Sequence, residues 1–183
     1  NSAENNVVRY CSVQGSCSST GAGVVFFSTS TAGNGNDNNI IEFCDITNAG
    51  GNRPVSAIYS NGSSGFVNSG NIIRNNQIYD FFRPTATSYG ICLTGNTSDW
   101  IIQGNSLYET TTLVPTGTFT YRAIYINNTA GNNFEITENM IGGSALGCGG
   151  SAFTISGATS LFYGIDLNVG TITPTSVQAN IIR

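Results

Sequence analysis

One hydrophobic pattern recurs six times along the chain. In each copy an aliphatic residue is followed, after two variable residues, by Asn or Cys, then by one variable residue and a second aliphatic residue. The Asn or Cys positions lie 33, 32, 29, 34 and 41 residues apart, and repeats of this length are typical of solenoid proteins. The central residues of the six copies are Cys11, Cys44, Asn76, Asn105, Asn139 and Asn180.

A second pattern alternates with the first. It consists of a small residue, an aliphatic residue, a variable residue and usually another apolar residue, and its five copies begin at Gly23, Ala57, Gly90, Ala123 and Gly164. The apolar positions of both patterns are spaced by two and rich in Val, Ile, Phe and Tyr, which predicts short β-strands. Each repeat therefore contains one copy of each pattern.

The spacing of the first pattern predicts a corner. Its two aliphatic residues are five apart, an odd number, so both can point inward only if the chain bends between them at the Asn or Cys. Asn suits such a corner because it tolerates the left-handed backbone region and its amide can bond to the same Asn one coil away, about 4.8 Å along the stack. With the second pattern as a third strand, we predict coils of three short strands, stacked in parallel.

The two patterns resemble those of right-handed parallel β-helices of the pectin-lyase-like superfamily, in which an Asn ladder occupies the tight turn between the second and third strands of each coil. The resemblance implies an all-β fold, a right-handed parallel β-helix solenoid of about five coils over residues 1–183. The Asn-rich, Lys-free composition of the chain, with segments such as 39–46, also resembles β-helical regions of large secreted or surface proteins of Bacteroidota, commonly exported by the type IX route. This second resemblance implies an extracellular or cell-surface location.

The charge and composition of the chain restrict the classes of partner that it is expected to bind. The formal net charge is −4, all six cationic residues are Arg, and they form no basic run, which argues against nucleic-acid binding. No apolar run approaches the roughly 20 residues that a membrane-spanning helix needs. The chain begins and ends within a repeat, and an uncapped solenoid end exposes unpaired strand groups, so we expect a single β-helix segment of a longer protein that lacks its caps.

The outward face of the third strand is the candidate for recognition. Its variable residues are expected to point outward, and in enzymes of the superfamily this face lines the substrate groove. Aromatic faces can also stack on sugar rings, and two rungs separate Tyr59 from Tyr125, about 10 Å by strand spacing. We therefore predict carbohydrate contact at this face; the alternative is that its tyrosines are ordinary strand residues. The predicted carbohydrate-binding residues are Tyr59, Cys92, Tyr125 and Asp166.

Catalysis by this segment has little support. Calcium-assisted elimination needs clustered carboxylates and a basic residue, and glycoside hydrolysis needs paired carboxylates about 5 to 10 Å apart. Only Asp166 lies on the expected groove, with Arg122 one coil earlier. The chain has no Lys or His, so the His- and Lys-bearing motifs of polygalacturonases, pectate lyases and alginate epimerases are missing.

A calcium site and a disulfide are weaker hypotheses. The segment 33–38, with Asp37 as the ligand, resembles one calcium turn of nonapeptide β-rolls, but a single copy lacks the neighbouring turn that completes the ligand shell. A plain turn without a cofactor is therefore favoured. Cys11 and Cys44 would stack with Cα atoms about 4.8 Å apart, which a disulfide accepts, but both are expected to point into the core, where reduced Cys serves as a small hydrophobic residue, so stacked thiols are slightly favoured.

These observations predict a non-catalytic structural or adhesive β-helix segment of a large secreted or cell-surface bacterial protein, with an extracellular glycan or a secretion or surface protein as its partner. Two alternatives stay open. The segment could belong to a polysaccharide lyase or hydrolase whose catalytic coils lie outside it, or it could be passenger cargo of a secretion apparatus.

Overall fold

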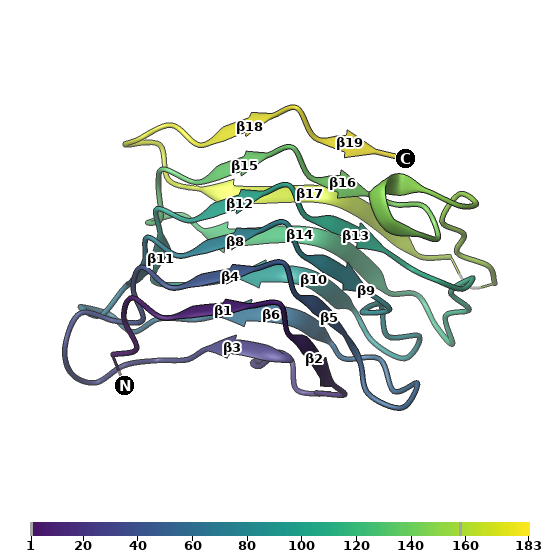
Figure 1. Ribbon diagram of the computed structural model, residues 1–183, viewed down its shortest axis with the longest axis horizontal. Helices are drawn as coiled ribbons and strands as arrows, with labels where there is room; N and C mark the ends of the chain where they lie inside the picture. Colours follow the sequence, from purple (N-terminus) through teal and green to yellow (C-terminus); the bar gives the residue numbers. More distant parts are fainter. Residues whose placement is uncertain (1, 158) are drawn as a thin grey trace.

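The chain forms a parallel β-solenoid (Figure 1). The computed structural model describes residues 2–157 and 159–183, and the pairings between its named strands are parallel. Three main sheets run along the stack, two of six strands and one of five. The predicted fold class, all-β with three short strands in each coil, is confirmed, and the number of coils is close to the predicted five.

The sheets are named here A, B and C. Sheet A contains β1 (Val7–Arg9), β4 (Ile40–Glu42), β8 (Ile72–Arg74), β12 (Ile101–Gln103), β15 (Glu135–Thr137) and β18 (Ser176–Gln178). Sheet B contains β2 (Ser12–Gly15), β5 (Asp45–Asn48), β9 (Gln77–Tyr79), β13 (Ser106–Tyr108), β16 (Met140–Ile141) and β19 (Ile181–Ile182). Sheet C contains β3 (Val25–Phe27), β6 (Ser56–Ser60), β10 (Ser88–Leu93), β14 (Thr120–Asn128) and β17 (Leu161–Val169). A small sheet pairs β7 (Asn68–Ser69) with β11 (Thr97–Ser98), and the one-turn helix η1 spans Leu146–Cys148.

In the inner coils the aliphatic residues of the first pattern form the core as predicted, whereas Val8, Val177 and Ile182 of the end coils are exposed. Ile41, Ile73, Ile102 and Ile136 are partners in successive strands of sheet A and are buried. The aliphatics that follow the corner stack in the same way in sheet B. Because each coil contacts its neighbours through these rows, burial of apolar side chains holds the coils together along the whole stack.

The ladder at the corner between sheets A and B is present. Asn76 Nδ2 donates to Asn105 Oδ1 at 3.0 Å, and the same bond joins Asn105 to Asn139 at 3.0 Å and Asn139 to Asn180 at 2.9 Å. Cys44 takes the next position, and its backbone N–H donates to Asn76 Oδ1 at 3.0 Å. The amides of Asn76, Asn105 and Asn139 are buried, so their mutual pairing satisfies polar groups that water does not reach.

One detail of the corner differs from the prediction. The residue in the left-handed region is the one before the ladder residue, with φ between 52° and 64°. This preceding residue makes the turn, which leaves the ladder side chain pointing inward between the coils. The left-handed residues are Tyr10, Phe43, Asn75, Gly104, Glu138 and Ala179.

A second column stands at the other end of sheet A. Asn6 Nδ2 donates to Asn39 Oδ1 at 2.9 Å, and Asn39 Nδ2 donates to Asn71 Oδ1 at 3.0 Å. In the next two coils the buried side chains of Trp100 and Phe134 occupy the same level. The column therefore changes from hydrogen-bonded amides to aromatic packing halfway along the stack.

The first copy of the second pattern has a different register from the one predicted. Val25 pairs with Ile58, and Phe26 pairs with Tyr59. Val25 therefore stands at the level of the inward Ile58, and Phe26, 45% exposed, takes the outward position that the pattern gives to Val25.

Long loops join sheet B to sheet C and gather on one side of the solenoid, at the right of Figure 1. The longest follows β16 and carries Phe153 and Ile155, which pack against the core from outside the coils. Phe153 contacts Phe82 and Phe162 at ring-centroid distances of 5.7 Å each. Within the described residues no helix has the length and apolar character needed to cross a membrane.

The five cysteines, all within the described residues, are free thiols. Cys44 is buried, and its Sγ lies 3.2 Å from the Glu42 carbonyl oxygen; Cys11 is exposed in the first coil, and its Sγ lies 3.2 Å from the Arg9 carbonyl oxygen. Cys11 and Cys44 thus stand at successive ladder positions as a thiol pair.

Candidate functional site

The outer face of sheet C carries two columns of side chains. One column contains Phe26, Tyr59, Cys92, Tyr125 and Asp166, which are register partners from coil to coil. The other contains Tyr89, Arg122 and Tyr163. Two consecutive residues between the columns are buried, Gly90 and Ile91 in β10 and Ala123 and Ile124 in β14, so the residues that flank each pair, three apart in one strand, face the same way.

The small residue between the columns has a steric cause. A Cβ built on Gly90 would lie 2.5 Å from the Ala123 carbonyl oxygen and 2.8 Å from a Leu107 methyl group. Both distances are below 3.0 Å, so any side chain at position 90 would clash with its neighbours. This close packing explains why the second sequence pattern has a glycine in β10.

Arg122 is the centre of this face. Its guanidinium carbon lies 4.5 Å from the ring centroid of Tyr125, 5.4 Å from that of Tyr163 and 5.8 Å from that of Tyr89. Its Nε donates to Asp166 Oδ2 at 2.6 Å. Tyr89 and Tyr125 stack with centroids 5.4 Å apart and an interplanar angle of 16°. We call these five residues the Arg122 cluster.

The electrostatics fix the charge state of the cluster. Burial alone would lower the pKa of Arg122, but the hydrogen bond and charge of Asp166 raise it, so the guanidinium stays positive. For Tyr89, burial disfavours the ionised hydroxyl and therefore raises its pKa, so this hydroxyl stays protonated at neutral pH. The Arg122 and Asp166 side chains are 20% and 29% exposed, so the ion pair and the rings beside it are open to solvent on one side.

The structure brings two of the four predicted recognition residues together. Tyr125 and Asp166 both belong to the Arg122 cluster. Tyr59 and Cys92 face the same way but are only 7% and 2% exposed. The expectation that Tyr59 offers its ring to solvent is therefore wrong: Phe26 packs over it at a centroid distance of 5.5 Å, and its hydroxyl oxygen lies 3.3 Å from Thr94 Oγ1.

The Cys92 thiol is not suited to act as a nucleophile or a metal ligand at this face. Burial raises the pKa of its thiol to about 12, so the thiol stays protonated and is a poor nucleophile or metal ligand.

Two residues of the Arg122 cluster, Tyr89 and Tyr163, were not predicted from the sequence. The signal was present, because Tyr, Arg and Tyr directly precede the small residue in three successive copies of the second pattern.

A second polar cluster lies beneath the loops between sheets B and C. Arg53 pairs with Glu109 and, through Nη2, with Asp80 Oδ1 at 2.9 Å. Glu109 Oε1 also accepts hydrogen bonds from the backbone N–H groups of Phe81 and Phe82, both at 3.0 Å. Burial raises the pKa of Glu109 to about 8, while Arg53 and the two N–H groups oppose that shift. The cluster ties three successive coils together.

Asp37, the predicted calcium ligand, is 8% exposed. Its Oδ1 accepts a hydrogen bond from the Ser69 backbone N–H at 2.8 Å. Within residues 2–157 and 159–183 no group of three or more His, Cys, Asp or Glu side chains could hold a metal ion. Calcium binding at this turn stays the less favoured hypothesis, and a plain turn stays the prediction.

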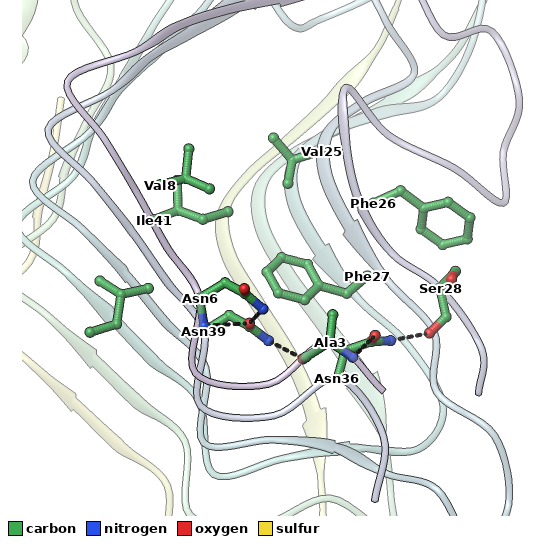
Figure 2. A pocket seen from close by; sticks show the side chains of 11 residues that line it. Ala3, Asn6, Val8, Val25, Phe26, Phe27, Ser28, Asn36, Asn39 and Ile41 are labelled. Atoms are coloured by element: carbon green, nitrogen blue, oxygen red, sulfur yellow. Dashed lines mark hydrogen bonds between the residues drawn. The ribbon is translucent and has the colours of Figure 1, made fainter. Parts of the chain in front are cut away.

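A hollow of about 390 Å³ opens at the first coil. Figure 2 shows Val8 and Ile41 on one side, Val25 and Phe27 on another, and hydrogen-bonded Asn6 and Asn39 at the edge. These apolar side chains are the inward-facing residues of the first two coils. The hollow is therefore the interior of the solenoid rather than a site with converging polar groups.

Comparisons with protein-family models, with curated proteins and with solved structures gave no match to this chain.

Proposed function

We propose that the chain is a non-catalytic structural or adhesive segment of a β-helix whose sheet C face contacts carbohydrate through the Arg122 cluster. The observation that carries the proposal is the packing of three tyrosine rings around an ion-paired arginine. Tyrosine rings can stack on the C–H faces of sugars, and hydroxyl and guanidinium groups can hydrogen-bond to sugar hydroxyls. Of these rings, Tyr163 is 40% exposed and offers the most accessible face.

The spacer role is supported by the architecture. Each coil contacts only its neighbours and adds about 4.8 Å to the length of the stack. The Asn ladder between sheets A and B, and the column of amides and aromatic rings at the other end of sheet A, link successive coils, while the loops on one side differ in length from coil to coil. These are properties of a rod that holds a binding face at a fixed distance.

The proposed setting is a large secreted or cell-surface bacterial protein of the pectin-lyase-like superfamily, and its support is the repeat pattern with an Asn ladder at the corner between sheets A and B. The alternative role, as a passenger of a secretion apparatus, is compatible with the same rod-shaped β-helix. A catalytic role has weaker support. Among the described strands of sheet C, Asp166 is the one carboxylate, and it is ion-paired with Arg122.

Affinity electrophoresis tests the proposal. The folded chain is run through native gels that contain one soluble polysaccharide each, beside gels without polysaccharide. We expect retardation in at least one polysaccharide gel, and we expect Tyr163→Ala to reduce it. The matched control is Tyr79→Ala, which removes a tyrosine stacked on Tyr108 on the face of sheet B. Equal mobility of the wild-type chain in all gels would contradict carbohydrate contact.

A further inference from the structure

A polar hollow of about 200 Å³ lies between two of the loops that join sheet B to sheet C. One wall is formed by Thr110, Thr111 and Thr112, and the other by Ser144 and Ser151 from the loop after β16. Phe153 and the buried Glu109 also line it. The hollow is separate from the Arg122 cluster, and neither the sequence patterns nor the proposed function uses it.

The first wall is held by the Arg53 cluster. Asp80 accepts hydrogen bonds from the Thr110 backbone N–H at 3.0 Å and from the Thr110 hydroxyl at 2.8 Å. Arg53 Nη2 donates to Thr111 Oγ1 at 2.9 Å. Each hydroxyl keeps hydrogen-bonding capacity beyond these contacts, because a hydroxyl has one donor and two acceptor sites. The wall is therefore fixed in place and still polar.

The second wall is braced by backbone contacts. The Ser151 N–H donates to Ser144 Oγ at 2.9 Å. The two walls are joined by a short parallel bridge, in which the Leu113 N–H donates to the Thr154 carbonyl oxygen at 2.9 Å. A hollow whose walls are already ordered requires little loss of conformational entropy when a ligand binds.

The charges beside the hollow restrict its ligand. Arg53 is engaged by two carboxylates, Asp80 and Glu109, so an anion meets no unpaired cation in this cluster. A cation meets no free carboxylate there, because Asp80 pairs with Arg53 and burial raises the pKa of Glu109 to about 8, which keeps it protonated at neutral pH. What the hollow offers is hydroxyl donors and acceptors together with one aromatic side chain, Phe153. This set suits a neutral polyhydroxyl molecule.

We propose that this hollow is a second binding site, which takes one neutral sugar ring. Hydroxyls of Thr111, Thr112 and Ser151 hydrogen-bond to the sugar hydroxyls, and Phe153 contacts an apolar face of the ring. The volume fits one small polar molecule rather than a chain, so affinity is modest, with dissociation constants in the millimolar range. The site recognises a terminal or single residue, whereas the Arg122 cluster lies on an open face.

Saturation-transfer difference NMR tests the proposal, with glucose, galactose, mannose and fucose as neutral probes and glucuronate and glucosamine as charged ones. The decisive variant is Ala152→Trp, which fills the hollow from an exposed position in its lining. The matched control is Ala145→Trp, exposed in the same loop but outside the lining. Tyr125→Ala separates this site from the Arg122 cluster. Thermal unfolding establishes that each variant is folded.

We expect saturable transfer from at least one neutral sugar, transfer that persists in Tyr125→Ala, a loss of about tenfold or more in affinity in Ala152→Trp, and unchanged binding in Ala145→Trp. Three results would overturn the proposal. They are the absence of transfer from every neutral sugar to the folded wild-type chain, binding that Ala152→Trp leaves intact or Tyr125→Ala abolishes, and a preference for glucuronate or glucosamine over the neutral sugars. Loss of the retardation in polysaccharide gels would not bear on this site.

Discussion

Replacing Asn105 by Leu removes one member of the amide ladder at nearly constant side-chain volume. Asn105 is fully buried; its Oδ1 accepts from the backbone N–H and the Nδ2 of Asn76, and its Nδ2 donates to the Ile73 carbonyl oxygen and to Asn139 Oδ1, all at 2.8 to 3.0 Å. The substitution leaves at least two neighbouring groups without this partner. A buried polar group left unpaired costs about 1–3 kcal/mol, so we expect a loss of about 4 kcal/mol.

Thermal unfolding followed by circular dichroism measures the loss. For a chain of this length, 4 kcal/mol corresponds to a fall of about 8–16 °C in Tm. The control is Gln103→Leu on the outer face of β12, where Gln103 Nε2 donates to Glu138 at 3.1 Å near solvent; a change of this kind costs within about 0.5 kcal/mol. Amide exchange at Asn76 should also quicken. A fall in Tm for Asn105→Leu no larger than that for Gln103→Leu would show that the ladder does not stabilise the fold.

Three further predictions use other parts of the molecule. Ile136→Asp should prevent folding because it buries an unpaired charge, whereas Glu135→Lys on the exposed side of the same strand should be tolerated; equal expression of folded protein would refute the assignment of faces. The folded chain holds a proton on Glu109 that the unfolded chain releases between its usual pKa of 4.5 and about 8, so the unfolding free energy should fall as pH rises through that range. Urea titrations across pH should show a shallower fall for Glu109→Gln, and an unchanged slope would contradict this cause. EDTA should leave the Tm unchanged, and a decrease that Asp37→Asn abolishes would establish a calcium turn.

The parts of the fold that repeat with one chemistry could be predicted from the sequence. The aliphatic rows of sheets A and B and the ladder from Asn76 to Asn180 keep the same residue type or nearly so in each copy, and the odd spacing around the Asn or Cys located the corner. The column of Asn39 and Asn71 was missed because it continues as Trp100 and Phe134. A search for one residue type stops where amide pairing gives way to aromatic packing.

The candidate site could be predicted only in part. The alternation of apolar and variable positions along a strand shows on which face of the sheet a residue lies, but not which other side chains cover it. Tyr125 and Asp166 were placed correctly on the outer face, but Phe26 and Thr94 cover Tyr59, and Phe26 reaches it through a shift of one residue in the first coil. The pairing of Arg53 with Asp80 and Glu109 joins loops of unequal length from three coils. Such contacts depend on the conformations of the loops, and the loop sequences show no repeating pattern from which these could be predicted.

The most direct test of the central claim is a glycan array probed with the wild-type chain, Arg122→Gln and Tyr125→Ala side by side, with Tyr79→Ala as the control for loss of a surface aromatic residue. Carbohydrate contact at the Arg122 cluster predicts binding to a defined set of glycans by the wild-type chain and by Tyr79→Ala. The same glycans should lose most of their signal with Arg122→Gln and with Tyr125→Ala. Binding that both cluster variants retain in full, or a wild-type chain that is folded and binds no glycan, would contradict the account.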